Sequence, residues 1–315
     1  MPADRESAAT VAVGRVGERR RAAAMPAVFV LVWSTGFVVA RYAMPHAPPL
    51  TFLSLRYALS ILAFGIWIGI ARVEWPRGRA QWLHLAVTGL TMQAGYLGGV
   101  WTAVRHGIGA GTVALIVGLQ PLATALWVSA TGQEHRIAAR QWFGLALGLC
   151  GLVLVLWDKL GAGELGLLTL SSAFVALASI TFGTLYQKRY VKPCDVRSAN
   201  ALQQTAALAA TAPLALLESG GIDWQPELVG ALAWSVLALT LGASSLLYLL
   251  IQRGLATRVT SLMYLVPPCT ALLAWALFGE PFGPRVQGGI ALCALGVALV
   301  ARPAGGFGRP RAASP

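Results

Sequence analysis

Long stretches without any charged side chain are the feature that most constrains this chain. Asp, Glu, Lys and Arg are all absent from residues 109–133, 165–187, 198–217, 228–252 and 259–279. A helix needs about 20 apolar residues to cross the hydrocarbon core of a bilayer. Open sheets cannot span lipid, and these stretches lack the alternation of barrel strands. The pattern therefore predicts an all-α polytopic membrane protein.

Composition supports this prediction and excludes other classes. Only 11% of the 315 residues are charged, whereas soluble domains contain about 25%. The net charge of +12 does not indicate a nucleic-acid partner, because the basic residues lie in short loops and tails, where they orient helices. The four cysteines form no CxxC motif, so neither a metal site nor a disulfide framework is expected.

The apolar pattern predicts ten spans with short connections. Placing the N-terminus inside puts nineteen of the 24 Lys and Arg residues on the cytoplasmic side and four outside, with Arg56 within a span. Such a bias is a strong positive-inside signal and predicts an inner-membrane protein with both termini in the cytoplasm. The expected spans are 26–44, 50–71, 81–104, 108–131, 141–157, 165–187, 198–217, 229–251, 259–279 and 286–301.

An internal repeat fixes the expected architecture. Gly107–Glu134 resembles Gly254–Glu280, with Pro121 aligned on Pro268, and the helix that follows each stretch also matches. Five spans per half are an odd number, so the halves are predicted to be inverted repeats about an axis in the membrane plane. The expected organisation is a basic cytoplasmic tail (1–24), a first five-helix repeat (25–160), a second (161–303) and a cytoplasmic tail (304–315).

These elements give the chain a family resemblance. It rests on residues 33–37 (WSTGF) with Arg41 after them, on Thr51-Phe52 and Arg56-Tyr57, and on the proline-centred spans that end near Glu134 and Glu280. With the ten spans in two halves, the chain resembles EamA-type members of the drug/metabolite transporter superfamily over about residues 26–302. The resemblance implies metabolite transport without ATP, often export of amino acids or related compounds.

Arg56 is the only Lys or Arg expected well inside a span. A charge at bilayer depth is costly and usually faces a cavity that serves function. In that case Arg56 could hold a substrate carboxylate in a bidentate pair. The alternative is that its long side chain snorkels to the interface, about two helical turns away.

Polar and aromatic side chains within spans supply the other candidates. Gln93 and Tyr96 share one helix face at i, i+3, and they lie in the third span, whose inverted equivalent carries Tyr248. Other polar residues are expected to join helices rather than bind substrate. The predicted substrate-binding residues are Arg56, Gln93, Tyr96, Trp101, Tyr248 and Tyr264; the wider set adds Trp33, Ser34, Thr35, Gln120, Thr181, Gln203, Gln204, Ser244, Ser245 and Trp275.

Prolines and glutamates mark spans four and nine. Pro121, Pro267 and Pro268 interrupt these spans, and proline kinks a helix and frees a carbonyl, so they are predicted hinges; a static kink is the alternative. Glu134 and Glu280 close the same spans. For them we expect a structural role at the interface, paired with nearby arginines, more than a role in coupling.

The sequence thus predicts a secondary or facilitative transporter, not an enzyme, that moves a small polar metabolite by alternating access. No Walker A motif is present, so no ATP site and no cofactor are expected. No Asp or Glu lies in the middle of a span, which favours a facilitator or exchanger over carboxylate-based proton coupling. The alternative is an intramembrane enzyme acting on lipid or prenyl substrates, and a homodimer stays open.

Overall fold

The computed structural model describes residues 28–131, 139–160, 166–252 and 265–301, and within these ranges it is helical without a strand. The first helix spans Val28–Ala43. The others are α2 (Pro49–Ala71), α3 (Arg79–Gly89), η1 (Leu90–Gly95), α4 (Tyr96–Arg105), α5 (Ala110–Gly118), α6 (Gln120–Ala130), α7 (Ala139–Leu160), α8 (Leu167–Tyr190), α9 (Val196–Ala215), α10 (Pro226–Trp234), η2 (Ser235–Ser244), α11 (Ser245–Gln252), α13 (Val266–Phe278) and α14 (Pro284–Ala301).

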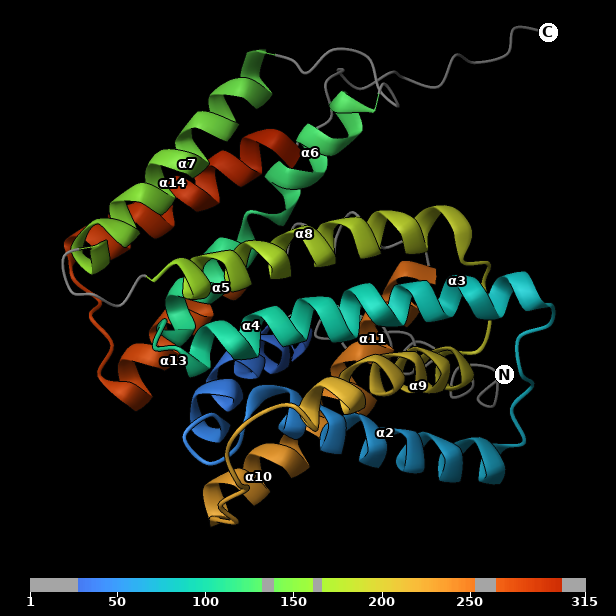
Figure 1. Ribbon diagram of the computed structural model, residues 1–315. Coiled ribbons are helices and arrows are strands. Elements are labelled where there is room, and N and C mark those ends of the chain that lie inside the picture. Colours follow the sequence, from blue (N-terminus) through green and yellow to red (C-terminus); the bar gives the residue numbers. More distant parts are fainter. Residues whose placement is uncertain (1–27, 132–138, 161–165, 253–264, 302–315) are drawn as a thin grey trace, which may run out of the picture.

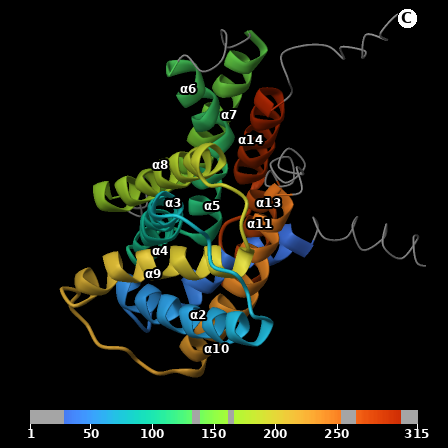
Figure 2. The ribbon, with the colours of Figure 1, turned by 90° about the vertical axis from the view of Figure 1, so that its right-hand side faces the viewer.

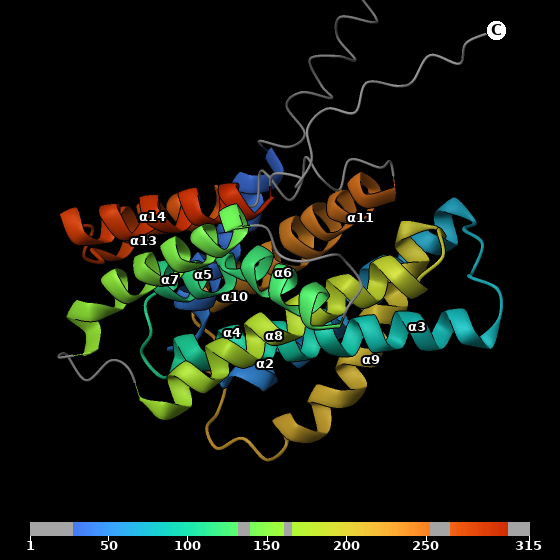
Figure 3. The ribbon, with the colours of Figure 1, turned by 90° about the horizontal axis from the view of Figure 1, so that it is seen from above.

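The described helices form a stack with one projecting pair. α8 packs against α4, and α9 packs against both α2 and α3, so these helices lie in successive rows (Figure 1). α7 and α14 lie side by side and project from the stack (Figure 2). Figure 3 shows α7 and α14 from above, close together at one end and farther apart at the other. The pairs α2–α9 and α7–α14 each join a helix from the first part of the chain to one from the second.

Helix α2 has its apolar face outside and its polar groups inside. Leu59, Leu62, Ile66 and Ile70 are exposed at helical spacing, whereas the opposite, buried face includes Arg56 and Ser60. A helix in water would show the reverse arrangement, with charged residues outside. The exposed stripe therefore suits contact with lipid tails.

Four helices are long and apolar enough to cross a membrane: 49–71, 110–127, 167–190 and 226–248. Four shorter apolar helices accompany them, at 28–43, 142–155, 266–278 and 284–299. The all-helical membrane fold is thus confirmed. The number of ten crossings stays a prediction, and residues 253–264, at the expected start of the ninth span, lie outside the described residues.

Two helical rods contain a π-helical segment in the middle. The first is α3–η1–α4, and the second is α10–η2–α11. π-helical turns are rare and are frequently found at functional sites. These rods correspond to the expected third and eighth spans, so both halves carry the same irregularity in the same place.

Glycines bring α7 and α14 into contact backbone to backbone. A Cβ added at Gly296 would lie 2.6 Å from the Gly148 nitrogen and against the Gly144 oxygen. At Gly151 an added Cβ would lie 2.5 Å from the Gly289 oxygen. Small residues allow this close approach in membranes.

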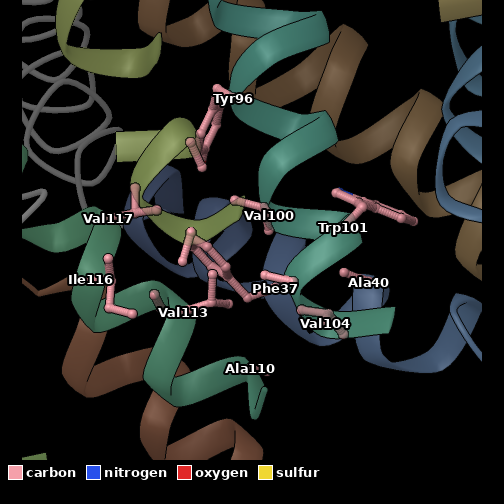
Figure 4. Packing of buried hydrophobic residues seen from close by; sticks show 14 of the residues in the cluster. Phe37, Ala40, Tyr96, Val100, Trp101, Val104, Ala110, Val113, Ile116 and Val117 are labelled. Atoms are coloured by element: carbon pink, nitrogen blue, oxygen red, sulfur yellow. The ribbon is translucent and has the colours of Figure 1, made fainter. Parts of the chain in front are cut away.

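Buried apolar side chains fill the space between α4, α5 and the first helix. Figure 4 shows Val100 and Val104 of α4, Val113 and Ile116 of α5, and Phe37 of the first helix in one cluster. All five are nearly inaccessible to solvent. This core fixes α4, which carries several of the predicted site residues.

Candidate substrate cavity

One large cavity lies between helices from both parts of the chain. It encloses about 770 Å³ of empty space, its open mouth included. Its lining is mostly apolar and aromatic, with a few amides and one guanidinium. The lining residues are Trp33, Gly36, Phe37, Arg56, Met92, Gln93, Tyr96, Leu97, Val100, Trp101, Ile180, Gln187, Asn200, Gln203, Leu239, Ser244, Leu247 and Tyr248.

Arg56 is the charged group of this cavity. It is 4% exposed, and its Nε and Nη2 donate to Thr240 Oγ1 at 3.2 and 3.1 Å. Thr240 Oγ1 in turn donates to the Ser235 carbonyl at 2.9 Å, within η2. Among the described residues no carboxylate pairs with Arg56, and its Nη1 has no hydrogen-bond partner there. The guanidinium is thus oriented by a neutral hydroxyl while its charge is left without a counter-ion.

Neutral amides lie on the same cavity wall. Gln203 of α9 is 4% exposed and lines the cavity, and its Nε2 has no partner among the described residues. Gly89 places this glutamine, because a Cβ added at Gly89 would lie 2.6 Å from the Gln203 Cα. Gln93 of η1 is held by its backbone, whose carbonyl accepts from Tyr57 Oη at 2.9 Å. The amide side chains can therefore form hydrogen bonds with a ligand.

Aromatic rings are held in place at two edges of the cavity. Trp101 stacks on Phe52 with centroids 4.4 Å apart, and both are buried. Tyr248 Oη lies 3.1 Å from Cys194 Sγ. Asn200 is satisfied by its own helix, since its amide donates to the Val196 carbonyl at 2.8 Å. Rigid aromatic walls of this kind favour an apolar ligand body.

The structure brings five of the six predicted site residues into this one cavity. Arg56, Gln93, Tyr96, Trp101 and Tyr248 all line it, and Tyr264 lies outside the described residues. Arg56 does not snorkel, because it is buried and directed to η2.

Several of the wider candidates do not line the cavity, and most of these form hydrogen bonds within a helix or between helices. Ser34 donates to its own helix at Val30, and Thr181 does so at Leu177. Gln120 donates to Thr184 on the neighbouring helix α8 at 3.0 Å. Trp275 is exposed, away from the cavity. Such bonds between and along helices are typical of polar residues in membranes.

The predicted hinge prolines lie at helix starts rather than inside helices. The helix breaks at Leu119, and Pro121 occupies the first turn of α6. Pro267 and Pro268 occupy the first turn of α13. Proline is well tolerated there, because its missing N–H is not needed. The end of α5 contacts the start of α13, since a Cβ added at Gly118 would lie 2.5 Å from Pro267 Cγ.

Two glutamates join the ends of paired helices. Glu280, after α13, accepts from the Ala110 and Gly111 amides at the start of α5, at 2.8 and 3.4 Å. Glu218, after α9, accepts from the Leu50 and Thr51 amides at the start of α2, at 2.9 and 2.8 Å. A carboxylate at a helix N-terminus is stabilised by the unpaired amides and the helix dipole. A structural role for Glu280 is thus confirmed, but its partner is a helix start rather than an arginine; Glu134 lies outside the described residues.

Thr240 is the residue that sequence reasoning missed. It lies in an apolar run, and nothing local distinguishes it from other threonines. Its role depends on Arg56, which is 184 positions away in the chain. Gln187 and Asn200 were also missed; each lies near a helix end, where polar residues are common. The described residues contain no cluster of His, Cys, Asp or Glu that could hold a metal.

Known proteins resemble this chain over most of its length. An "Uncharacterized transporter YvbV" of Bacillus subtilis is 24% identical over 295 residues, covering 90% of this chain and 92% of that protein. A "Probable amino-acid metabolite efflux pump" of Salmonella typhimurium is 27% identical over 281 residues, covering 84% and 90%. One solved crystal structure has a TM-score of 0.62 at 21% identity, covering 87% of this chain and 94% of that one, which shows a shared fold.

The sequence model of the EamA-like transporter family matches the chain twice. One match covers residues 21–157 and the other covers residues 167–302. Together they include the whole lining of the cavity and all helices described above except the last three residues of α7. The relatives named above are called transporters or efflux pumps, and none is called an enzyme. The chain is therefore a membrane transporter that belongs to the EamA-like transporter family.

Proposed function

We propose that this protein exports a small polar metabolite, an amino acid or a related compound, across the inner membrane. A relative at 27% identity is called a probable amino-acid metabolite efflux pump. The observation that carries the proposal is the cavity itself, which is lined by residues from both matched stretches and contains a buried cation. The proposed binding residues are Arg56, Gln93, Tyr96, Trp101 and Tyr248, together with Tyr264.

In this proposal the two matched stretches are inverted five-helix repeats that rock around the cavity. Support comes from the two family matches, from the π-helical segments at corresponding places and from the pairing of α2 with α9 and of α7 with α14. Inverted repeats place substrate near the bilayer midplane between the halves. The proposed hinges are the segments at Leu119 and Pro267, which lie in contact, with Pro121 and Pro268 beside them.

The arrangement favours an inward-facing state. Under the proposed orientation, with both termini in the cytoplasm, Gln187 and Asn200 lie toward the cytoplasmic ends of α8 and α9. Glu218 and Glu280 join helices at the opposite end. The cavity would then be reached from the cytoplasm and closed toward the outside, which is the state in which an exporter takes up its substrate.

The test combines a screen with reconstitution. Overexpressing cells are challenged with toxic amino acids and analogues, and any compound that they resist is loaded into liposomes with the purified protein. We expect protein-dependent movement that a pH gradient does not accelerate stoichiometrically, since no carboxylate lines the cavity among the described residues. Finding no compound that moves above empty liposomes would refute transport of this class.

A further inference from the structure

We propose that the cavity binds singly charged organic anions, carboxylates above all, more tightly than zwitterions or cations with the same apolar body. This inference rests on the proposed transport function and favours, among amino acids and related compounds, those related compounds that lack the ammonium group. The observation behind it is a charge imbalance. Arg56 is the single charged residue in the part of the lining that the structure describes, and no acidic side chain of the described residues pairs with it.

The first argument is the cost of an isolated buried cation. A charge removed from water without a counter-charge is strongly unfavourable, and pairing it recovers much of the loss. The Thr240 hydroxyl orients the guanidinium but brings no negative charge. A ligand with one negative charge makes the occupied cavity neutral, so its binding supplies the counter-ion that the fold withholds.

The second argument concerns hydrogen-bond donors. A carboxylate has two oxygens that accept several bonds, and Arg56 offers Nη1, which has no partner among the described residues. Gln203 offers a second donor after a half-turn of its amide, because Nε2 is itself buried without a partner and the turn places it where Oε1 lies. Both side chains line the same cavity, from helices α2 and α9, which pack against each other.

The third argument concerns what an ammonium group would meet. An α-amino acid brings a positive charge that must lose water on entering the cavity. The described lining offers the ammonium group only neutral amides, hydroxyls and aromatic faces. The positive charge of Arg56 also repels the ammonium group. A zwitterion therefore gains less than the matching monoanion, and a free amine gains least. A dianion leaves its second charge uncompensated.

The rest of the lining determines the body of the ligand. Trp33, Phe37, Leu97, Val100, Ile180 and Leu247 present apolar surface. Apolar lining with few polar groups favours a ligand whose uncharged part is apolar. An aryl or alkyl carboxylate combines this body with the single charge that Arg56 requires.

The experiment measures binding to the full-length protein in phosphatidylcholine nanodiscs at pH 7 by titration calorimetry. One probe set is 3-phenylpropionate, phenylalanine, 3-phenylpropylamine and benzylsuccinate; a second is indole-3-propionate, tryptophan and tryptamine. We expect each monoanion to bind about 10-fold or more tightly than its zwitterion, with the amine weakest, because hydrogen bonds to a charged partner are worth roughly that much. Benzylsuccinate should bind more weakly than 3-phenylpropionate.

Variants tie the preference to Arg56. Arg56→Gln should weaken monoanion binding about 10-fold to 100-fold and bring monoanion and zwitterion to similar affinity. Arg56→Lys keeps the charge and should keep part of the preference. Arg77→Gln is the matched control, since Arg77 is fully in solvent and far from the lining. Melting curves verify that each variant is folded.

The outcomes separate this inference from the proposed function. If the wild type binds zwitterions as tightly as monoanions, or binds monoanions no better than Arg56→Gln does, the inference is wrong, even if transport of an amino acid is observed. If monoanions are preferred through Arg56 but no compound moves across liposomes, the inference stands and the transport proposal fails.

Discussion

Two helix pairs in this protein are built from corresponding parts of the chain but are used differently. α7 and α14 meet through glycines, with backbone against backbone. α2 and α9 are joined at one end, where the Glu218 carboxylate accepts from the first amides of α2. Farther along α2 and α9, Arg56 and Gln203 line the cavity.

The difference shows how one architecture separates frame from site. Where small residues fill the contact, no room is left for a polar group, and the pair can only be rigid. Where the contact is secured at the end of the helices, the middle can hold groups whose hydrogen bonds are incomplete. Incompletely satisfied buried groups cost stability, so we infer that α2–α9 retains them for ligand binding.

The largest expected effect is on the frame. Gly296→Val would force α14 away from α7, because the new side chain meets backbone atoms of Gly144 and Gly148. Overpacking of this kind costs about 3 kcal/mol or more when the backbone cannot yield. Gly288→Val on the same helix is the matched control, since a Cβ there meets only Leu154 at 3.7 Å. Equal melting temperatures and equal yields for the two variants would contradict this account of α7–α14.

The next effect concerns the glutamate that joins α2 and α9. Glu218→Gln removes the negative charge from the start of α2 and should destabilise the protein by about 1–2 kcal/mol. Glu74→Gln, at an exposed ion pair with Arg77, should cost less than about 1 kcal/mol. Thermal unfolding in detergent compares the two. A loss of stability for Glu74→Gln as large as that for Glu218→Gln would show that Glu218 stabilises the protein no more than an exposed ion pair does.

A smaller effect is expected at the cavity. Thr240→Val removes the hydroxyl that orients Arg56 without changing the size of the side chain, and it should raise the substrate KM about 3-fold to 10-fold, or roughly 1 kcal/mol. Thr240→Ser restores the hydroxyl and should restore the KM. The measurement is substrate movement in proteoliposomes. If serine does not rescue the variant, Thr240 acts through packing and not through Arg56.

The smallest effect depends on pH. Asp195 caps the start of α9 and accepts from the Arg197 amide and guanidinium at 2.8–3.0 Å. The hydrogen bond from the Arg197 side chain lowers the pKa of Asp195 below its usual value near 4. Because the folded-state pKa is the lower one, this stabilisation is complete above pH 4 and is lost as the pH falls through the folded-state pKa.

Asp195→Asn tests this dependence, and it should lower the free energy of unfolding by less than about 1 kcal/mol. The asparagine keeps a cap but cannot ionise, so the melting temperature of the variant should fall less between pH 5 and pH 3 than that of the wild type. Parallel curves for the two proteins would mean that Asp195 contributes no pH dependence.

The sequence by itself determined the class of fold and most of the predicted binding residues that line the cavity. Charge-free stretches of helical length can only be satisfied as helices in lipid, and a lone arginine such as Arg56 within them must find a protected environment. Gln93, Tyr96, Trp101 and Tyr248 followed from the same reasoning, since polar and aromatic groups in apolar helices avoid lipid.

Only the tertiary structure decided which groups meet. Arg56 and Thr240 are 184 positions apart, and Glu218 reaches Thr51 across 167. Local patterns report the face on which a residue lies, but the partner depends on the register in which two helices pack. That register is fixed by shape, at contacts such as Gly89 against Gln203 and Gly296 against Gly148. The sequence determined that a buried cation exists, and the packing decided that it would face a cavity in which no described residue supplies a counter-ion.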